Sequence, residues 1–176
     1  MASTPSTIKW SFELVLLPVS DVDRAKQFYD SLGWSCDIDH TAATGIRIVQ
    51  FTPPGSAGSI MFGNKLTTAA PGSVQGLHLI VNDVVATRGD LLARGIAVSD
   101  FFHDEGGIFH RVGEEGRTKG PNPQRKSYAS YVSFSDPDGN GWVVQEVTAR
   151  LGPDLKPDDT RFTPEIRNAA LGLPPP

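Results

Sequence analysis

The segment that decides the fold is Val-Ser-Asp-Val-Asp-Arg-Ala-Lys-Gln-Phe-Tyr-Asp-Ser-Leu-Gly, residues 19–33. It follows a β-rich stretch that begins at Phe12, and Asp21 supplies a side chain that can cap a helix. Apolar residues then recur at helical spacing as far as Leu32, and Gly33 can end the helix in a left-handed conformation. The segment therefore predicts a strand that leads into a capped helix.

The same pattern returns in the second half of the chain. Residues 81–95 read Val-Asn-Asp-Val-Val-Ala-Thr-Arg-Gly-Asp-Leu-Leu-Ala-Arg-Gly, and an apolar run precedes them. Asp83 and Gly95 each lie 62 positions after their counterparts, Asp21 and Gly33. The constant offset indicates an internal duplication of one strand–helix unit.

Further strand-like stretches follow each predicted helix. They are residues 34–38, 45–52 and 59–62 in the first unit, and residues 96–100, 127–135 and 142–147 in the second. Each unit therefore reads β-α-β-β-β. The matching turn prolines, Pro53 and Pro137, lie 84 positions apart rather than 62, so the second unit carries 22 extra residues. These residues must lie between about Asp100 and Ser127.

Length and composition limit the class of protein. A chain of 176 residues with 39% hydrophobic and 20% charged residues has the proportions of one globular domain. Its net charge of -4 disfavours binding to a phosphate backbone. The chain has one cysteine, no apolar run that could span a bilayer and no secretory signal. We therefore expect a cytoplasmic protein with neither a nucleic-acid partner nor a membrane partner.

Two motifs resemble those of a known family. Residues 19–33 resemble the first-helix signature of the vicinal oxygen chelate superfamily, and Phe-Ser-Asp-Pro-Asp-Gly-Asn-Gly-Trp at 134–142 resembles its last hairpin. That superfamily includes glyoxalase I, bleomycin-resistance proteins and extradiol dioxygenases. The resemblance implies an α+β fold in which paired βαβββ modules form a half-barrel cup.

The resemblance also implies a domain plan. We expect a single domain over residues 8–150 and a Pro-rich C-terminal arm over residues 151–176. Within the domain, module one covers about 10–65 and module two about 76–148, with the inserted loop at about 101–127. Members of the family commonly dimerise, so a homodimer is expected.

Chelating members of the family place a metal ligand in each of four strands. The corresponding positions here are Leu14, Gly76, Val143 and either Ser59 or Ile60. None of them offers the imidazole or carboxylate that a divalent ion needs, so we expect no metal cofactor. A shifted strand register or a β-bulge would instead bring in one of three metal-capable residues, Glu13, His78 and Glu146.

Strand parity indicates which side chains enter the cup. His78 lies two residues after Gly76, and Gln145 lies two residues after Val143, so both should face inward. His78 is a candidate general base, and equally a hydrogen-bonded core histidine. Gln145 is a candidate to bind a carbonyl or hydroxyl group, or else a structural amide. Tyr131 is one of the aromatic residues expected near the cup.

The insert combines charged residues with glycines and prolines that exclude a long helix. We expect Phe109 and His110 to contact a ligand at the mouth of the cup. Arg117 and Arg125 are candidates to bind an anionic group on that ligand. The alternatives are a solvated loop held by its own ion pairs, or a dimer contact.

Two functions fit these residues. The favoured one is a small-molecule-binding protein that resembles the bleomycin-resistance branch and holds an organic ligand without chemistry. The alternative is a glyoxalase- or dioxygenase-like lyase, isomerase or oxygenase acting on an oxygenated organic substrate. Without a metal, that enzyme would need His78 or an insert residue as acid or base, and Arg117 or Arg125 to stabilise an oxyanion. The sequence does not decide whether the protein is an enzyme.

Overall fold

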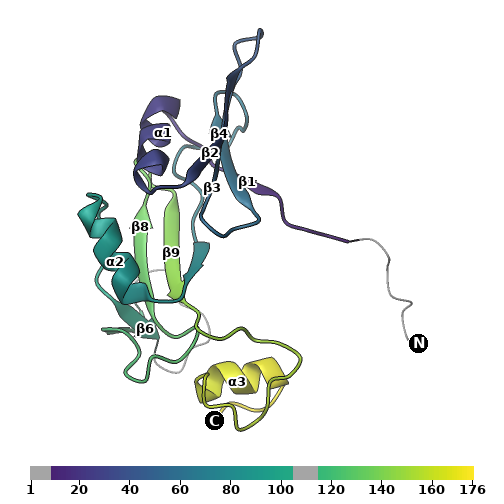
Figure 1. Ribbon diagram of the computed structural model, residues 1–176, viewed down its shortest axis with the longest axis vertical. Helices are drawn as coiled ribbons and strands as arrows, with labels where there is room; N and C mark the ends of the chain where they lie inside the picture. Colours follow the sequence, from purple (N-terminus) through teal and green to yellow (C-terminus); the bar gives the residue numbers. More distant parts are fainter. Residues whose placement is uncertain (1–8, 105–114) are drawn as a thin grey trace. The chain divides into compact units, whose positions relative to one another are not determined.

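The computed structural model describes residues 9–104 and 115–176, which form two compact units (Figure 1). The first unit extends to Ser73 and includes Pro137–Asn140, and the second holds Val74–Asp136 and Gly141–Pro176. Each unit contains one sheet covered by a helix. This arrangement confirms the α+β class and the paired βαβββ modules.

The first unit contains one helix and four strands. They are β1 (Leu14–Leu16), α1 (Val22–Ser31), β2 (Ser35–Thr41), β3 (Arg47–Thr52) and β4 (Ser59–Gly63). The strand order is β1-β4-β3-β2, with β1 parallel to β4 and the other pairs antiparallel. Tyr29 of α1 is fully buried against Phe51 and Phe62, with ring centroids 6.0 and 5.5 Å away. An aromatic cluster therefore holds α1 on its sheet.

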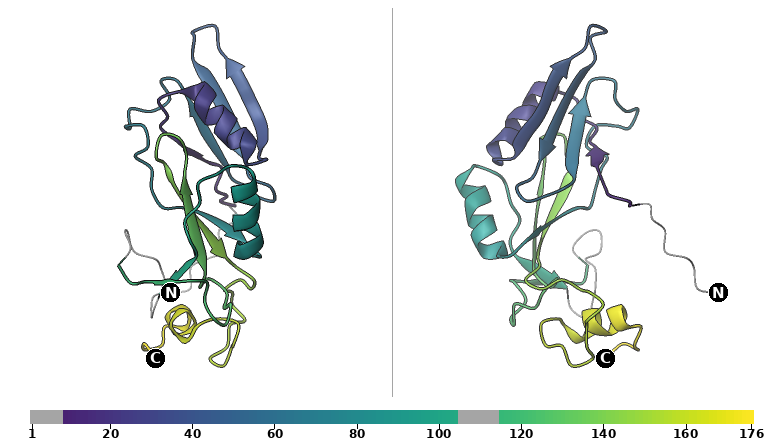
Figure 2. Two further views of the ribbon diagram at one scale, coloured as in Figure 1. Left: turned by 90° about the vertical axis from the view of Figure 1, so that its left-hand side faces the viewer. Right: turned by 45° about the vertical axis from the view of Figure 1, so that its right-hand side comes forward.

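Residues 64–76 lie between the last strand of the first unit and the first strand of the second. The elements of the second unit are β5 (Leu77–Val81), α2 (Val84–Ala93), β6 (Phe102–Asp104), β7 (Arg117–Lys119), β8 (Tyr131–Ser135), β9 (Gly141–Glu146) and α3 (Pro164–Leu171). The strand order is β5-β9-β8-β6-β7, with β5 parallel to β9. Helix α2 runs along one face of β8 and β9 (Figures 1 and 2).

The two repeated helices begin and end where the sequence predicts. The side chains of Asp21 and Asp83 accept hydrogen bonds from backbone N–H groups in the first turns of α1 and α2. Gly33 (φ 74°) and Gly95 (φ 79°) follow the helix ends in the left-handed region, where a side chain would be strained. Both helices have ten residues, and their bounds differ by 62 positions.

The strand predicted over residues 96–100 is wrong, because only a single bridge forms there, between Val98 and Phe134. Ser99 explains the interruption. Its N–H donates to the Ser133 carbonyl, but its side-chain hydroxyl, not its carbonyl, accepts from the Ser133 N–H. The Ser99 carbonyl instead accepts from the side chain of Arg88. Regular pairing resumes only at β6, to which β7 of the insert adds a further strand.

The C-terminal segment contains α3, which the sequence pattern did not predict. Thr163 caps this helix, and Pro164 occupies its first turn. Phe162 and Ile166 are 1% and 5% exposed, so the segment packs against the rest of the second unit, to which it belongs. The ring of Phe162 stacks on Tyr128 at 6.3 Å. None of the helices in the described residues combines the length and the apolar character needed to cross a bilayer.

Candidate functional site

The second sheet has a face that points away from α2. Glu146 identifies the helix side, because its carboxylate accepts a hydrogen bond of 3.0 Å from the first backbone N–H of α2. Side chains alternate along a strand, so Val143 and Gln145 point to the opposite face. The strand register places His78 beside Val143, and Tyr131 beside Gln145. We call the surface formed by Phe102, Tyr131, Val143, Gln145 and the residues in register with them the distal face.

An aromatic stack lies on the distal face. The rings of Phe102 and Tyr131 are nearly parallel, with centroids 5.3 Å apart, and both are buried together with Val143. The guanidinium carbon of Arg117 lies 4.2 Å from the Phe102 ring centroid, within the range of a cation–π interaction. The structure thus brings two of the predicted site residues, Arg117 and Tyr131, onto one stack.

A hydrogen-bonded triad adjoins the stack. The Tyr131 hydroxyl donates to the Tyr128 carbonyl at 2.7 Å, and the Gln145 amide donates to that carbonyl at 2.9 Å and to the Tyr131 hydroxyl oxygen at 3.1 Å. Burial, with a further contribution from the nearby charge of Asp104, raises the pKa of Tyr131 to about 12. Tyr131 is therefore a neutral hydrogen-bond donor at physiological pH.

A pocket of about 430 Å³ opens at the β6–β7 edge of the sheet. It is lined by Ser99, Asp100, Phe101, Phe102, Arg117, Thr118 and Lys119. The Nε atom of Arg117 is buried, and it has no hydrogen-bond partner among the described residues. A buried N–H without a partner is costly, so this edge of the pocket is suited to a ligand that can accept a hydrogen bond from it.

The other predicted arginine has a different environment. Arg125 donates to the Glu146 carboxylate through Nε at 2.9 Å and through Nη2, and it lies 3.4 Å from Asp83. Glu146 is 1% exposed and belongs to the α2 side of the sheet. Hydrogen bonds to both carboxylates raise the pKa of Arg125, the bond to Glu146 contributing most. The structure therefore places Arg125 in an internal ion pair rather than beside Arg117.

His78 lies on the distal face at an exposed position of β5. Its Nδ1 atom is 2.7 Å from the Gly76 carbonyl, and a carbonyl can only accept, so Nδ1 carries the proton of this hydrogen bond. Phe109 and His110, the two insert residues expected to contact a ligand, lie outside the described residues.

The family metal positions lack side chains that can ligate a metal ion. Leu14 pairs in register with Ser59, whose hydroxyl is hydrogen-bonded to Thr52 at 2.7 Å and to Gln50 at 3.3 Å. The other two positions, Gly76 and Val143, offer no side-chain donor. Within the described part of the chain, no three His, Cys, Asp or Glu residues gather in a way that would hold a metal ion. This donor set does not fit a divalent cation.

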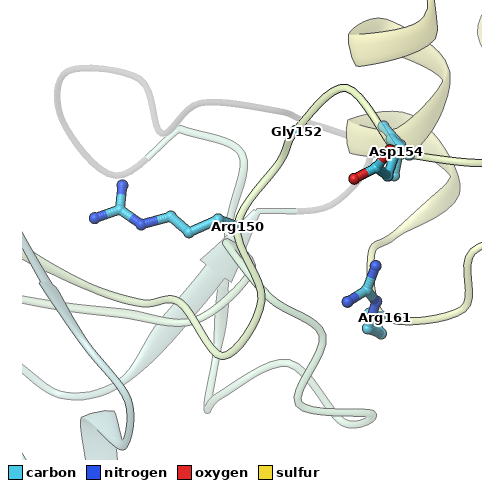
Figure 3. Close-up of a pocket in the computed structure, with 5 residues that line it drawn as sticks. Arg150, Gly152, Asp154 and Arg161 are labelled. Carbon is cyan, nitrogen blue, oxygen red and sulfur yellow. The ribbon is translucent and has the colours of Figure 1, made fainter.

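A second pocket, of about 270 Å³, lies in the C-terminal segment (Figure 3). Its two arginines do not converge, because the Arg150 side chain points away from Arg161 and Asp154. Arg161 is already paired with Asp159 at 2.7 Å. The distal face therefore offers the better-organised combination of apolar and polar groups.

Two residues important to this face could not be found from sequence alone. Phe102 lies at the border of the insert, where no repeat defines its register. Tyr128 contributes its backbone carbonyl, which any residue type possesses, and its φ of 67° is unusual for a tyrosine. The signal for Gln145, by contrast, was strand alternation, and Tyr131 was expected near the cup as an aromatic residue.

Comparisons with known families and solved structures point to one superfamily. The family model of the Glyoxalase/Bleomycin resistance protein/Dioxygenase superfamily matches residues 11–144. None of the curated protein sequences matched the chain. The solved structures that it resembles include TnmS3, an antibiotic binding protein from Streptomyces sp. CB03234, with 28% identity and a TM-score of 0.58. That match covers 81% of this chain and 99% of TnmS3.

Two further structures are similar. A glyoxalase/bleomycin resistance protein from Streptomyces sp. CB03234 is 30% identical with a TM-score of 0.55, and the match covers 77% of this chain and 100% of that one. A superfamily member from Sphaerobacter thermophilus DSM 20745 is 26% identical with a TM-score of 0.56, covering 78% and 98% of the two chains.

Proposed function

Because the chain belongs to the glyoxalase/bleomycin resistance protein/dioxygenase superfamily, we propose that it binds a small organic molecule on the distal face without converting it. The observation that carries the proposal is the stack of Arg117, Phe102 and Tyr131 beside the Gln145 amide. Phe102 and Arg117 also line the pocket at the β6–β7 edge, and the flat surfaces of a ring and a guanidinium group favour a planar ligand there. The resemblance to an antibiotic binding protein supports an antibiotic-like natural product as that ligand.

The roles of the residues follow from their chemistry. Phe102 supplies apolar contact in the pocket of β6 and β7 and is backed by the buried Tyr131 and Val143, while Arg117 holds an anionic or hydrogen-bond-accepting group of the ligand in the same pocket. The proposed binding uses no divalent metal, since the four family positions hold Leu, Gly, Val and either Ser or Ile. Arg125 supports the fold through Glu146 and has no direct part in binding.

The proposal is tested by calorimetric titration with planar aromatic antibiotics, some with and some without a carboxylate. We expect saturable binding, and mass spectrometry should recover each ligand unchanged. Arg117→Met should weaken the binding of carboxylate-bearing ligands by about tenfold, with little effect on neutral ones. Arg150→Met, which alters an exposed arginine outside the distal face, is the matched control. Absence of saturable binding across the panel would refute the proposal.

Catalysis is the second candidate function, and the geometry of His78 favours it. Because Nδ1 donates to the Gly76 carbonyl, the neutral ring has its basic lone pair on Nε2, as a general base requires. The recovered ligand distinguishes the two functions. A product that forms with the wild type but not with His78→Ala would establish the enzyme, whereas an unchanged ligand supports binding alone.

We also expect a homodimer. Strands β1 and β5 end their respective sheets, and apolar side chains on or before them are exposed: Phe12 by 70%, Leu16 by 39% and Ile80 by 44%. Unpaired edges with exposed apolar residues favour association. Sedimentation equilibrium should give twice the 18.9 kDa chain mass, and a monomer at micromolar concentration would contradict the expectation.

A further inference from the structure

The orientation of the Gln145 amide follows from the partners around it. The atom that lies 2.9 Å from the Tyr128 carbonyl oxygen must be Nε2, because a backbone carbonyl can only accept a hydrogen bond. The Tyr131 hydroxyl is 2.7 Å from the same carbonyl, so its single hydrogen is donated there. It can therefore only accept from Gln145, at 3.1 Å. Both hydrogens of Nε2 are used in this way.

The acceptor that fixes the amide is itself held in place. Tyr128 has φ 67°, and its N–H donates to the Glu146 carbonyl at 2.8 Å, which ties the Tyr128 backbone to the end of β9. Reversing the Gln145 amide would place two oxygens against each other at the Tyr128 carbonyl. The amide therefore has one orientation, with the Oε1 atom turned away from both tyrosines.

This orientation leaves one acceptor on the distal face. Gln145 is 9% exposed, and no described residue donates a hydrogen bond to its Oε1 atom. A ligand hydroxyl or N–H can satisfy this oxygen. A ligand carbonyl or ether at the same place would leave two acceptors facing each other without a proton, which is unfavourable once the ligand has displaced water from this oxygen.

We propose that Gln145 determines ligand specificity: it selects a phenolic hydroxyl or N–H group and rejects a carbonyl or ether oxygen at that position. This inference rests on the proposed function, because it takes the distal face as the binding surface. It narrows the ligand class to planar molecules that carry a hydrogen-bond donor on the part facing Gln145 and an anionic or acceptor group toward Arg117.

The test uses two probes that differ in one hydrogen-bond donor, 6-hydroxy-2-naphthoate and 6-methoxy-2-naphthoate. We expect the wild type to bind the hydroxyl probe about tenfold more tightly. Gln145→Met keeps the length of the side chain but removes the acceptor, so the two affinities should become equal within about twofold. Gln27→Met, at an exposed position of α1, should retain the full preference.

The outcomes separate this inference from the function on which it rests. If both probes bind the wild type equally, or the methoxy probe binds better, the specificity role is overturned and the binding function stands. If neither probe binds, both are overturned. If Gln145→Met unfolds, a third probe decides with the wild type: 6-amino-2-naphthoate, which carries an N–H donor, should also bind more tightly than the methoxy probe, and equal binding would overturn the specificity role.

Discussion

The carboxylate of Glu146, which is 1% exposed, accepts hydrogen bonds from both Nε and Nη2 of Arg125. The same carboxylate accepts from the first backbone N–H of α2. One buried side chain thereby joins the end of β9, the start of α2 and the segment that leads to Tyr128. The ion pair thus helps to place the Tyr128 carbonyl that orients Gln145.

Removing Arg125 should destabilise the protein. Removing one partner of a fully buried ion pair costs about 3–5 kcal/mol. Because the Arg125 side chain is 41% exposed, we expect Arg125→Met to lower the free energy of unfolding by about 2 kcal/mol. Urea unfolding, followed by circular dichroism, measures this change. Arg94→Met is the control, because Arg94 and its partner Asp90 are both exposed at the end of α2. Equal stability of the Arg125→Met protein and the wild type would show that the ion pair is not structural.

The raised pKa of Tyr131 predicts an alkaline effect on stability. The folded state holds this proton more tightly than the unfolded chain, whose tyrosines titrate near pH 10. The stabilisation is therefore complete below about pH 10 and is lost as the pH rises toward about 12. Ultraviolet difference spectra of the wild type and Tyr131→Phe should isolate a tyrosine that ionises near pH 12. If the tyrosine that the Tyr131→Phe variant lacks ionises near pH 10 instead, that result would contradict the burial of this hydroxyl.

The sequence predicts those parts of the fold that depend on local signals. Asp21 and Gly33 act on backbone groups within one turn, so the helix bounds follow from them directly. Strand alternation likewise places Gln145 on the face opposite Glu146. The partner of Arg125 lies 21 residues away across the sheet, and no local pattern specifies such a pair. For this reason the sequence indicates a charged side chain at Arg125 but not its ion pair with Glu146.

Two glycines of the chain should respond to alanine in opposite ways. Gly72 has φ +74°, and a Cβ there would lie 2.0 Å from the Asp138 carbonyl oxygen, so Gly72→Ala should destabilise by at least about 2 kcal/mol. Gly89 is an exposed position within α2, and no atom lies within 4 Å of an added Cβ. Gly89→Ala should therefore stabilise by about 0.5–1 kcal/mol. Thermal unfolding of both variants tests the prediction, and a neutral Gly72→Ala would contradict the close approach to Asp138.

Chelation should leave the protein unaffected. The family metal positions hold Leu14, Gly76, Val143 and either Ser59 or Ile60, and the buried carboxylate of Glu146 is already paired with Arg125. We therefore expect the melting temperature and the affinity for 6-hydroxy-2-naphthoate to be unchanged after dialysis against EDTA, and likewise after addition of zinc, nickel, manganese or ferrous iron. Elemental analysis of the purified protein is the independent measurement. A stoichiometric metal whose removal abolishes binding would show that side chains other than these form a metal site, and that the ligand is held through it.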